Sequence, residues 1–392
     1  MTVWNRRQPE RKYSTVEVVR VTRSKSWARG AVLSVAALVI GLGLVACGGD
    51  SGGGGPKIAL LLPESKTTRY EAHDHPEFED AVNAACSDCE IIYNNANQDA
   101  ATQQSQMESA LTDGAEVVVL DPVDSASAAS MVQLAKQQDV PVVSYDRLIL
   151  DTPDVDAYVS FDNVKVGELQ GSTLAKRLAD DGNANGPIVK INGSPTDNNA
   201  TLFGQGADSA LNGAGVTVAK EYDTPDWSPD KAQSEMDQAI TALGKTGFKG
   251  LYAMNDGTAG GAIAAMQAAG IDPKTIPSTG QDAELEAVQR ILTGDQFMTV
   301  YKATKPEATT AAQIAVALAN GKPIPQNLIT TKTNNGSTDV PSALLTPVAV
   351  TKDNVATAEE GGQPLIGSDG YWTPDDICTA EFESACKAAG IS

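Results

Sequence analysis

Short apolar runs alternate with helical segments along most of this 392-residue chain, and this alternation restricts the fold more than any other feature. The runs are rich in Val, Ile and Leu, which is typical of strands buried on both faces of a parallel sheet. The strand candidates of the first half are 57–62, 89–93, 116–120 and 140–143, with helix candidates at 76–86, 101–113 and 125–138. Strands that alternate with helices predict a doubly wound parallel sheet of the α/β class.

A second series of the same kind follows the first. Its strand candidates are 187–191, 216–221, 250–254, 275–279 and 294–302, its helix candidates are 200–212, 228–243, 257–269 and 305–320, and a closing strand is expected at 341–350. Ser228 suits an N-cap and Pro229 the first position of the helix that follows it. Two similar α/β lobes explain this repetition better than one large sheet, and their facing carboxyl edges would enclose a cleft.

The first 46 residues have the pattern of an export signal. Three basic residues precede an apolar stretch, 31–46, that is short for a membrane span. Residues 44–47 read Leu-Val-Ala-Cys and resemble the bacterial lipobox, which implies cleavage before Cys47, a diacylglycerol on its sulfur and anchoring to the outer face of the cell membrane. The alternative is a chance cysteine after an apolar run. The glycine-rich stretch 47–56 is typical of a flexible tether.

The net charge of the chain limits the classes of partner that it can bind. The formal net charge is −21, of which residues 1–46 contribute +6 through eight Arg or Lys and two Glu, so that the remainder carries −27. Such an acidic chain is a poor partner for nucleic acid or for an anionic membrane surface. The charge says little about a neutral ligand.

The remaining cysteines and the histidines raise the question of a metal. Four cysteines form two close-spaced pairs: Cys86 with Cys89, and Cys378 with Cys386. In an exported protein such pairs indicate disulfides, each of which would stabilise only a small loop. A four-thiolate zinc site is the alternative, but the pairs are far apart in sequence. His73 and His75 are spaced like a metal pair but lie in a predicted loop, so we expect neither metal nor cofactor.

Polar residues at one strand end indicate a binding site. The run that ends at Val143 leads directly into Tyr145, Asp146 and Arg147. Ligands of open α/β sheets bind beyond the carboxyl ends of the strands. A carboxylate beside a guanidinium supplies hydrogen-bond acceptors and a rigid fork of donors, which suits a polyhydroxylated ligand. The alternative is an ion pair on the surface.

Seven motifs in order make the assignment more specific. They are 145–147 (Tyr-Asp-Arg), 160–163 (Ser-Phe-Asp-Asn), 193–199 (Gly-Ser-Pro-Thr-Asp-Asn-Asn), 255–256 (Asn-Asp), 279–282 (Thr-Gly-Gln-Asp), 299–302 (Thr-Val-Tyr-Lys) and 339–347 (Asp-Val-Pro-Ser-Ala-Leu-Leu-Thr-Pro). From residue 57 to about 354 the chain closely resembles the D-xylose-binding proteins of bacterial ABC transporters, within the type I periplasmic sugar-binding family. The resemblance implies two doubly wound parallel-sheet lobes joined by a three-stranded hinge, with the sugar between them. The expected lobes are 57–163 plus 304–345, and 164–303 plus 346–392 with a tail pinned by a disulfide.

The resemblance also implies the ligand-binding residues. They are Arg69, Tyr70, Asp146 and Arg147 from the first lobe, Asp197, Asn199, Trp227, Asn255 and Asp282 from the second, and Lys302 near a crossover. Trp227 would stack on the sugar ring, whereas Asn198 would point away. Asp162 and Asn163 are expected in a crossover. Tyr70 stands where the xylose-binding pattern has tryptophan, which leaves glucose, ribose, arabinose or galactose open as alternatives to xylose.

The implied function is that of a monomeric, lipid-anchored binding protein that delivers a monosaccharide to an ABC permease in the membrane or serves as a sugar sensor. A carbohydrate hydrolase is the rival, with Asp146 and Asp282 as its acid–base pair. However, Arg147 and Lys302 should keep these carboxylates ionised, and the sequence has neither a nucleophile elbow nor a phosphate-binding glycine loop. A sugar-responsive repressor would need a helix-turn-helix, and none is present.

Overall fold

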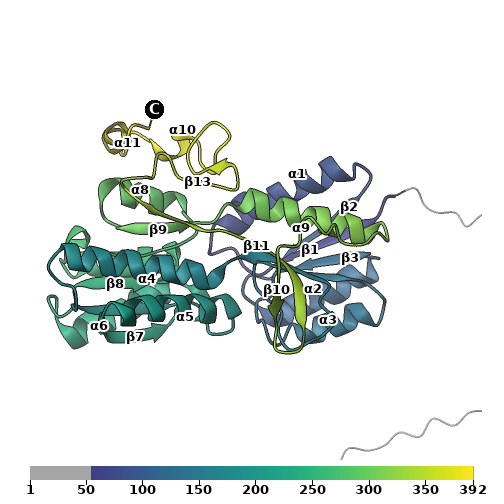
Figure 1. Cartoon of the computed structure of the whole chain (residues 1–392), viewed down its shortest axis with the longest axis horizontal. Coiled ribbons are helices and arrows are strands. Elements are labelled where there is room, and N and C mark those ends of the chain that lie inside the picture. Colours follow the sequence, from purple (N-terminus) through teal and green to yellow (C-terminus); the bar gives the residue numbers. More distant parts are fainter. Residues whose placement is uncertain (1–53, 392) are drawn as a thin grey trace, which may run out of the picture. The chain divides into compact units, whose positions relative to one another are not determined.

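A seven-stranded sheet forms the centre of the first lobe (Figure 1). The structure is a computed structural model and describes residues 54–391. The predicted signal peptide, Cys47 and most of the predicted tether lie outside these residues. The strands, in their order across the sheet, are β10 (Thr331–Asn334), β11 (Asp339–Leu345), β5 (Ala157–Phe161), β4 (Val142–Tyr145), β3 (Val117–Leu120), β1 (Lys57–Leu62) and β2 (Glu90–Asn95).

Helices cover both faces of this sheet, and the side chains of β1 show how. All neighbouring strands are parallel except β10 and β11 at one edge. Leu60 and Leu62 of β1 pack with α1 (His75–Ala85) and α9 (Thr304–Ala319). Leu61 packs on the other face, where the helices are α2 (Ala100–Thr112) and α3 (Ala129–Lys136). The alternation of side chains along a strand therefore gives this sheet two buried faces.

The second lobe repeats the architecture around a smaller sheet. Its three parallel strands lie in the order β7 (Thr217–Asp223), β6 (Pro187–Asn192) and β8 (Gly250–Ala253). The helices are α4 (Asn163–Asp180) and α5 (Asn198–Gly213), with α6 (Pro229–Leu243) and α7 (Asp256–Ala268), and then α8 (Leu285–Thr293). Helices α4 and α5 cross closely because Gly167 and Gly206 have no Cβ; a Cβ at either would overlap the backbone of the other helix.

Three connections join the two lobes. Strand β5 leads into α4, β9 (Met298–Tyr301) leads into α9, and β11 leads into β12 (Val348–Thr351), which pairs antiparallel with β9. The expected mixed α/β fold with parallel sheets is confirmed. The expected single strand 341–350 is wrong, because the chain changes sheets between Leu345 and Val348. Pro347 lies at this change and has no N–H to donate to a ladder.

Two more expected strands differ. The strand expected at 294–302 covers only Met298–Tyr301, because Gly294 (φ 88°) ends α8. The strand expected at 275–279 is almost absent. Only Ser278 pairs with the sheet, through a single parallel bridge to Leu251, and a short 3-10 helix (Pro273–Thr275) precedes it. Proline, at the start of that turn, fixes a φ that suits the helix rather than the strand. None of the helices in residues 54–391 is both long and apolar enough to cross a membrane.

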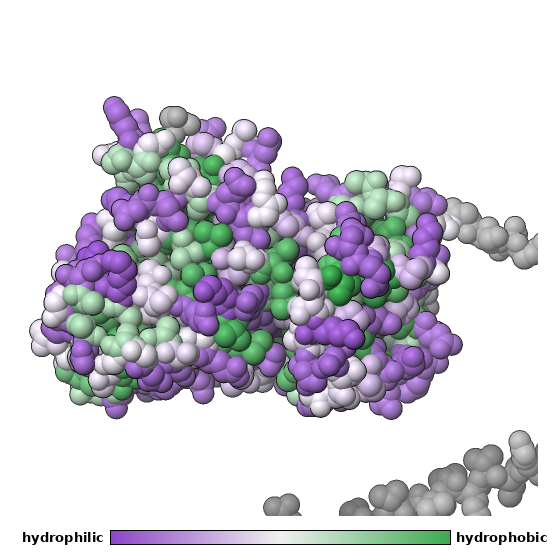
Figure 2. All heavy atoms as spheres, viewed as in Figure 1, coloured by the Kyte–Doolittle hydropathy of each residue, from purple (hydrophilic) through white to green (hydrophobic). Residues whose placement is uncertain are grey.

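The chain ends in a tail that packs beside α8 and β9 (Figure 1, yellow). Its elements are β13 (Glu359–Glu360), β14 (Gln363–Pro364), α10 (Pro374–Ile377) and α11 (Glu383–Ala389). Disulfides join Cys378 to Cys386 in the tail and Cys86 to Cys89 after α1, as expected from the spacing. Hydrophilic side chains predominate on the face drawn in Figure 2, which fits the acidic composition.

Candidate functional site

A small cavity lies between the lobes, where the carboxyl ends of the two parallel sheets face each other. Its lining residues follow strand ends or start helices, as expected for open α/β sheets. They are Thr67, Tyr70, Asp146, Arg147, Asp197, Asn199, Phe203, Trp227, Asn255, Gln281, Asp282 and Lys302. Nine of the ten residues predicted to bind ligand are in this set.

Asp146 stands at the tip of β4 in a conformation that its neighbours fix. Its φ is 51°, in the left-handed region, and its carbonyl oxygen accepts hydrogen bonds from the hydroxyls of Tyr158 (3.0 Å) and Ser160 (2.6 Å). Asn199 of α5 donates to its carboxylate Oδ1 at 2.6 Å. These contacts aim the carboxylate into the cavity and join the two lobes directly.

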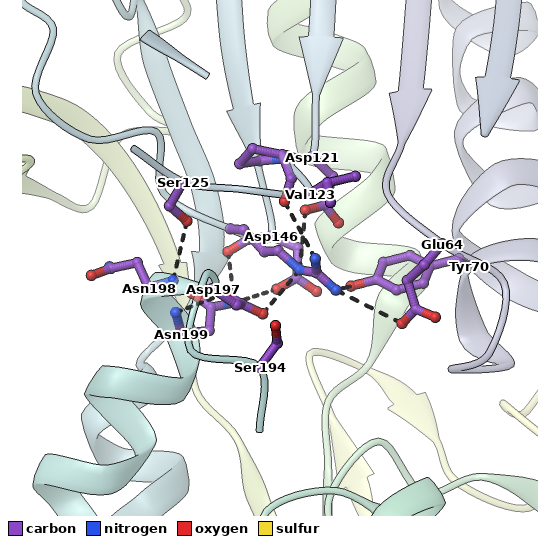
Figure 3. Close-up of polar contacts among 12 residues, drawn as sticks. Glu64, Tyr70, Asp121, Val123, Ser125, Asp146, Ser194, Asp197, Asn198 and Asn199 are labelled. Carbon is purple, nitrogen blue, oxygen red and sulfur yellow. Dashed lines mark hydrogen bonds and ion pairs between the residues drawn. The ribbon is translucent and has the colours of Figure 1, made fainter. Parts of the chain in front are cut away.

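Arg147 is surrounded by carboxylates, among them Glu64, Asp121 and Asp197, which Figure 3 labels. Its Nε lies 3.0 Å from Asp197 Oδ2 and 3.5 Å from Asp121 Oδ1, and its Nη2 lies 3.7 Å from Glu64 Oε1. Burial acts to lower the pKa of Arg147, but the neighbouring negative groups raise it well above its ordinary value. The guanidinium is therefore a permanent cation. Nη2 also donates to the Tyr70 hydroxyl, at a long 3.4 Å.

Arg69 was predicted to contact the ligand, but it does not line the cavity. Its guanidinium is buried and donates to Asp74 (2.6 and 2.8 Å) and to Glu307 (2.6 Å), and Nη1 lies 2.8 Å from Asp146 Oδ2. Burial acts to raise the pKa of Asp146, yet Arg69, Lys302 and Arg147 together lower it below its ordinary value. In this structure Arg69 therefore holds Asp146 as an ionised acceptor.

The helix that begins after Asp197 brings the second lobe to the cavity. Asp197 caps α5 by accepting from the Asn199 backbone N–H at 2.8 Å, and Asn163 donates to Asn199 Oδ1 at 2.9 Å. Asn163 thus orients Asn199 from the start of α4. The Asn198 side chain points away from Asp146, as Figure 3 shows, while its backbone N–H donates to Ser125 Oγ at 3.1 Å.

Trp227 supplies a flat apolar wall. Its indole is buried and donates from Nε1 to Asp197 Oδ2 at 3.1 Å. The ring lies on Gly193, where any Cβ would overlap it, so this glycine is required by space. Phe203 meets the indole edge-on at a centroid distance of 6.4 Å. The sequence analysis missed Phe203, although it lies four residues after Asn199 and so on the same face of α5.

The remaining wall is polar. Lys302 Nζ lies 2.9 Å from Asp282 Oδ1; burial acts to lower the pKa of Lys302, but Asp282 and Asp146 raise it above its ordinary value. Asn255 caps α7 through Oδ1, which accepts from the backbone N–H of Thr258 at 2.9 Å, and its amide donors are not used by this cap. Gln281 also lines the cavity and was missed; within residues 54–391 its Oε1 has no hydrogen-bond partner.

Unusual backbone conformations gather at this cavity. Nine non-glycine residues within 54–391 have a positive φ, and five belong to the site or to its loops. These five are Asp146, Asp226, Trp227, Asp282 and Ala283. Such conformations cost free energy and tend to persist at functional sites. The cavity thus combines ionised acceptors, fixed cationic donors and aromatic faces, which match the hydroxyls and C–H faces of a neutral polyhydroxylated ring.

Comparison with known proteins also indicates a sugar-binding protein. The chain is 40% identical over 303 residues to the D-xylose-binding periplasmic protein of Escherichia coli (strain K12), covering 76% of this chain and 88% of that protein. It is 36% identical to the protein of the same name from Haemophilus influenzae, over 82% of this chain and 92% of that protein. A solute-binding protein of an ABC transporter from Clostridium phytofermentans, solved with bound β-D-glucose, superposes with a TM-score of 0.72 at 28% identity, covering 82% of this chain and 99% of that one. Residues 58–323 match the periplasmic binding protein domain, and the chain therefore belongs to the periplasmic binding protein family.

Proposed function

We propose that this protein is the extracytoplasmic substrate-binding protein of an ABC sugar importer and that it binds one monosaccharide, D-xylose before others, in the cavity between its lobes. The relatives named above are two D-xylose-binding periplasmic proteins and an ABC transporter solute-binding protein with bound β-D-glucose. The observation that carries the proposal is the pairing of Asp146 with Arg147 in a small cavity walled by Trp227. A carboxylate and a guanidinium at fixed positions can accept from and donate to adjacent hydroxyls of one ring.

We assign each lining residue a role that follows from its chemistry. Asp146, Asp197 and Asp282 accept hydrogen bonds from sugar hydroxyls, while Arg147, Lys302 and the amide of Asn255 donate to sugar oxygens. Asn199 holds Asp146 in place through its amide. The indole of Trp227 packs on one face of the ring, and Tyr70 and Phe203 flank it. Arg69 acts through Asp146. The lowered pKa of Asp146 argues against this residue as the general acid of a hydrolase, because a general acid needs a raised pKa.

Calorimetric titration with D-xylose, D-glucose, D-ribose, L-arabinose and D-galactose tests the proposal. We expect one site per chain and the tightest binding for xylose, and weaker binding for the open-chain pentitol xylitol, which has no ring face for the indole. If another monosaccharide binds most tightly, the assignment to xylose fails and the assignment to sugar remains. If no sugar produces heat at millimolar concentration, the proposed function is wrong.

We further propose that Cys47 carries the lipid anchor. The support is the lipobox-like segment before Cys47 and the glycine-rich stretch after it. Mass spectrometry of the membrane fraction should find acylated Cys47 at the N-terminus of the mature wild-type chain. In the Cys47→Ser variant the chain should be unprocessed and unacylated. An unmodified Cys47 in a processed wild-type chain would refute the anchor.

A further inference from the structure

The tail after β12 is firmly part of the second lobe. Its apolar side chains share a core with α8 and β9, and they are Val355, Leu365, Ile377 and Cys386, among others. Gln289 of α8 donates to the carbonyl oxygen of Ile377 at 3.2 Å. The disulfide between Cys378 and Cys386 closes the last loop. These contacts hold the tail against the second lobe, and Gln363 of the tail also contacts the first lobe by donating to Glu77 Oε1 (3.4 Å) and accepting from the Lys305 N–H (3.3 Å).

From this base the tail reaches the first lobe. The ring of Tyr371 stacks on His73, with centroids 3.9 Å apart and an interplanar angle of 18°. Trp372 meets the same imidazole edge-on at 4.7 Å. His73 belongs to a π-helical turn, Tyr70–Asp74, that begins with the cavity residue Tyr70. The tail is thus in contact with the back of one cavity wall.

The same aromatic pair also contacts the opposite wall. Trp372 Nε1 donates to the carbonyl oxygen of Ala283 at 2.8 Å. Ala283 follows Asp282, and both have a positive φ that their surroundings must maintain. Tyr371 and Trp372 therefore bridge the loop that carries Asp282 in the second lobe and the turn that carries Tyr70 in the first.

We propose that Tyr371 and Trp372 are positioning residues for the sugar site, which clamp the lobes together behind the cavity without touching the ligand. This inference rests on the proposed function and deepens it. The contacts with His73 exist only while the lobes are together, so they favour the closed over the open arrangement. Any such preference adds to the affinity for a ligand that binds the closed arrangement.

The test compares an aromatic stack that joins the two lobes, Tyr371 on His73, with one that lies within the first lobe, Tyr93 on His75. An aromatic pair is worth about a three- to tenfold change in an equilibrium constant, so Tyr371→Ala should weaken xylose binding by about that factor, mainly through faster dissociation. His73→Ala removes the same stack and leaves the tail sequence intact, so it should have the same effect. Tyr371→Phe keeps the stack and should restore binding. The matched control is Tyr93→Ala, because Tyr93 stacks on His75 within the first lobe at 3.5 Å; it should leave affinity unchanged.

Hydrogen exchange separates this inference from the proposed function. It is measured without sugar, where the closed arrangement is the minor population, and at saturating xylose, where it is the major one. In both Tyr371→Ala and His73→Ala, amides of residues 70–74 and 282–285 should exchange faster than in the wild type. In Tyr93→Ala the segment 282–285 should not change. If the wild type binds no sugar but these segments exchange faster in the two variants, the proposed function is wrong and the inference about Tyr371 and Trp372 is supported. If neither variant changes affinity or exchange, the clamp is overturned.

Discussion

Replacing Arg147 with alanine is expected to weaken xylose binding by at least 100-fold and to prevent closure of the lobes. The guanidinium reaches Asp197 of the second lobe at 3.0 Å, and it is the strongest donor group in the cavity. Hydrogen bonds to charged groups contribute about 1.5–3 kcal/mol each, so losing two of them corresponds to roughly 100-fold or more in affinity. Calorimetry measures the affinity directly.

The stability of this variant must be measured beside its affinity. Without Arg147, the buried carboxylates of Glu64, Asp121 and Asp197 lose their cation, and removing one partner of a buried ion pair commonly costs about 3–5 kcal/mol. Arg147→Lys keeps the charge but not the fork, and should retain the fold with an intermediate affinity. The control is Arg177→Ala, at an exposed ion pair with Asp181 on the surface of α4. A folded Arg147→Ala protein with wild-type affinity would contradict the assigned role.

Replacing Trp227 with alanine is expected to weaken binding by roughly 10- to 100-fold while closure persists. The indole offers area for a sugar face and burying a large aromatic side chain contributes several kcal/mol to a site, but its one hydrogen bond, to Asp197, lies within the second lobe. Trp227→Phe keeps a ring without the N–H and should recover part of the affinity. Calorimetry gives the affinity, and scattering at saturating sugar gives closure. An unchanged affinity in Trp227→Ala would show that the sugar does not stack on this wall.

The sequence predicted β1, β3 and β4 of the first lobe well, because strands buried on two faces need aliphatic side chains at nearly every position. It was less informative where packing overrides local preference. No element was assigned to Ala157–Asp180, which forms β5 and α4. Gly167 and Gly171 lower the helical propensity of α4, yet they are what lets α5 approach it. How closely α4 and α5 pack depends on the tertiary structure, so it could not be predicted from the local sequence of either helix.

The site was predictable in part for a similar reason. Polar residues that follow strand ends predict a binding site there, and nine of the ten predicted ligand-binding residues line the cavity. What the sequence could not separate is a residue that touches the ligand from one that supports it. Arg69 and Arg147 carry the same group, but only the contacts in space show that Arg69 lies behind Asp146. Glu64 and Asp121 were missed because an isolated carboxylate is normally on the surface, and only Arg147 makes their burial possible.

Closure of the lobes is the step that links the site to transport. Hinge closure around a ligand is established for periplasmic binding proteins, and here we propose it. A change from mostly open to mostly closed needs about 5 kcal/mol of differential binding. A sugar that bonds to Asp146 and Arg147 on one side and to Asp197 and Asn255 on the other can supply this, since each bond to a charged group contributes about 1.5–3 kcal/mol.

Small-angle X-ray scattering of the mature domain, with and without saturating D-xylose, tests this account most directly. Residues of the first and second lobes can contact one sugar at the same time only while the lobes are close together. We therefore predict that xylose decreases the radius of gyration of the wild type, and that it leaves the radius of Arg147→Ala unchanged at the same concentration. A radius of gyration that stays the same in the wild type at saturating xylose would contradict closure around the sugar.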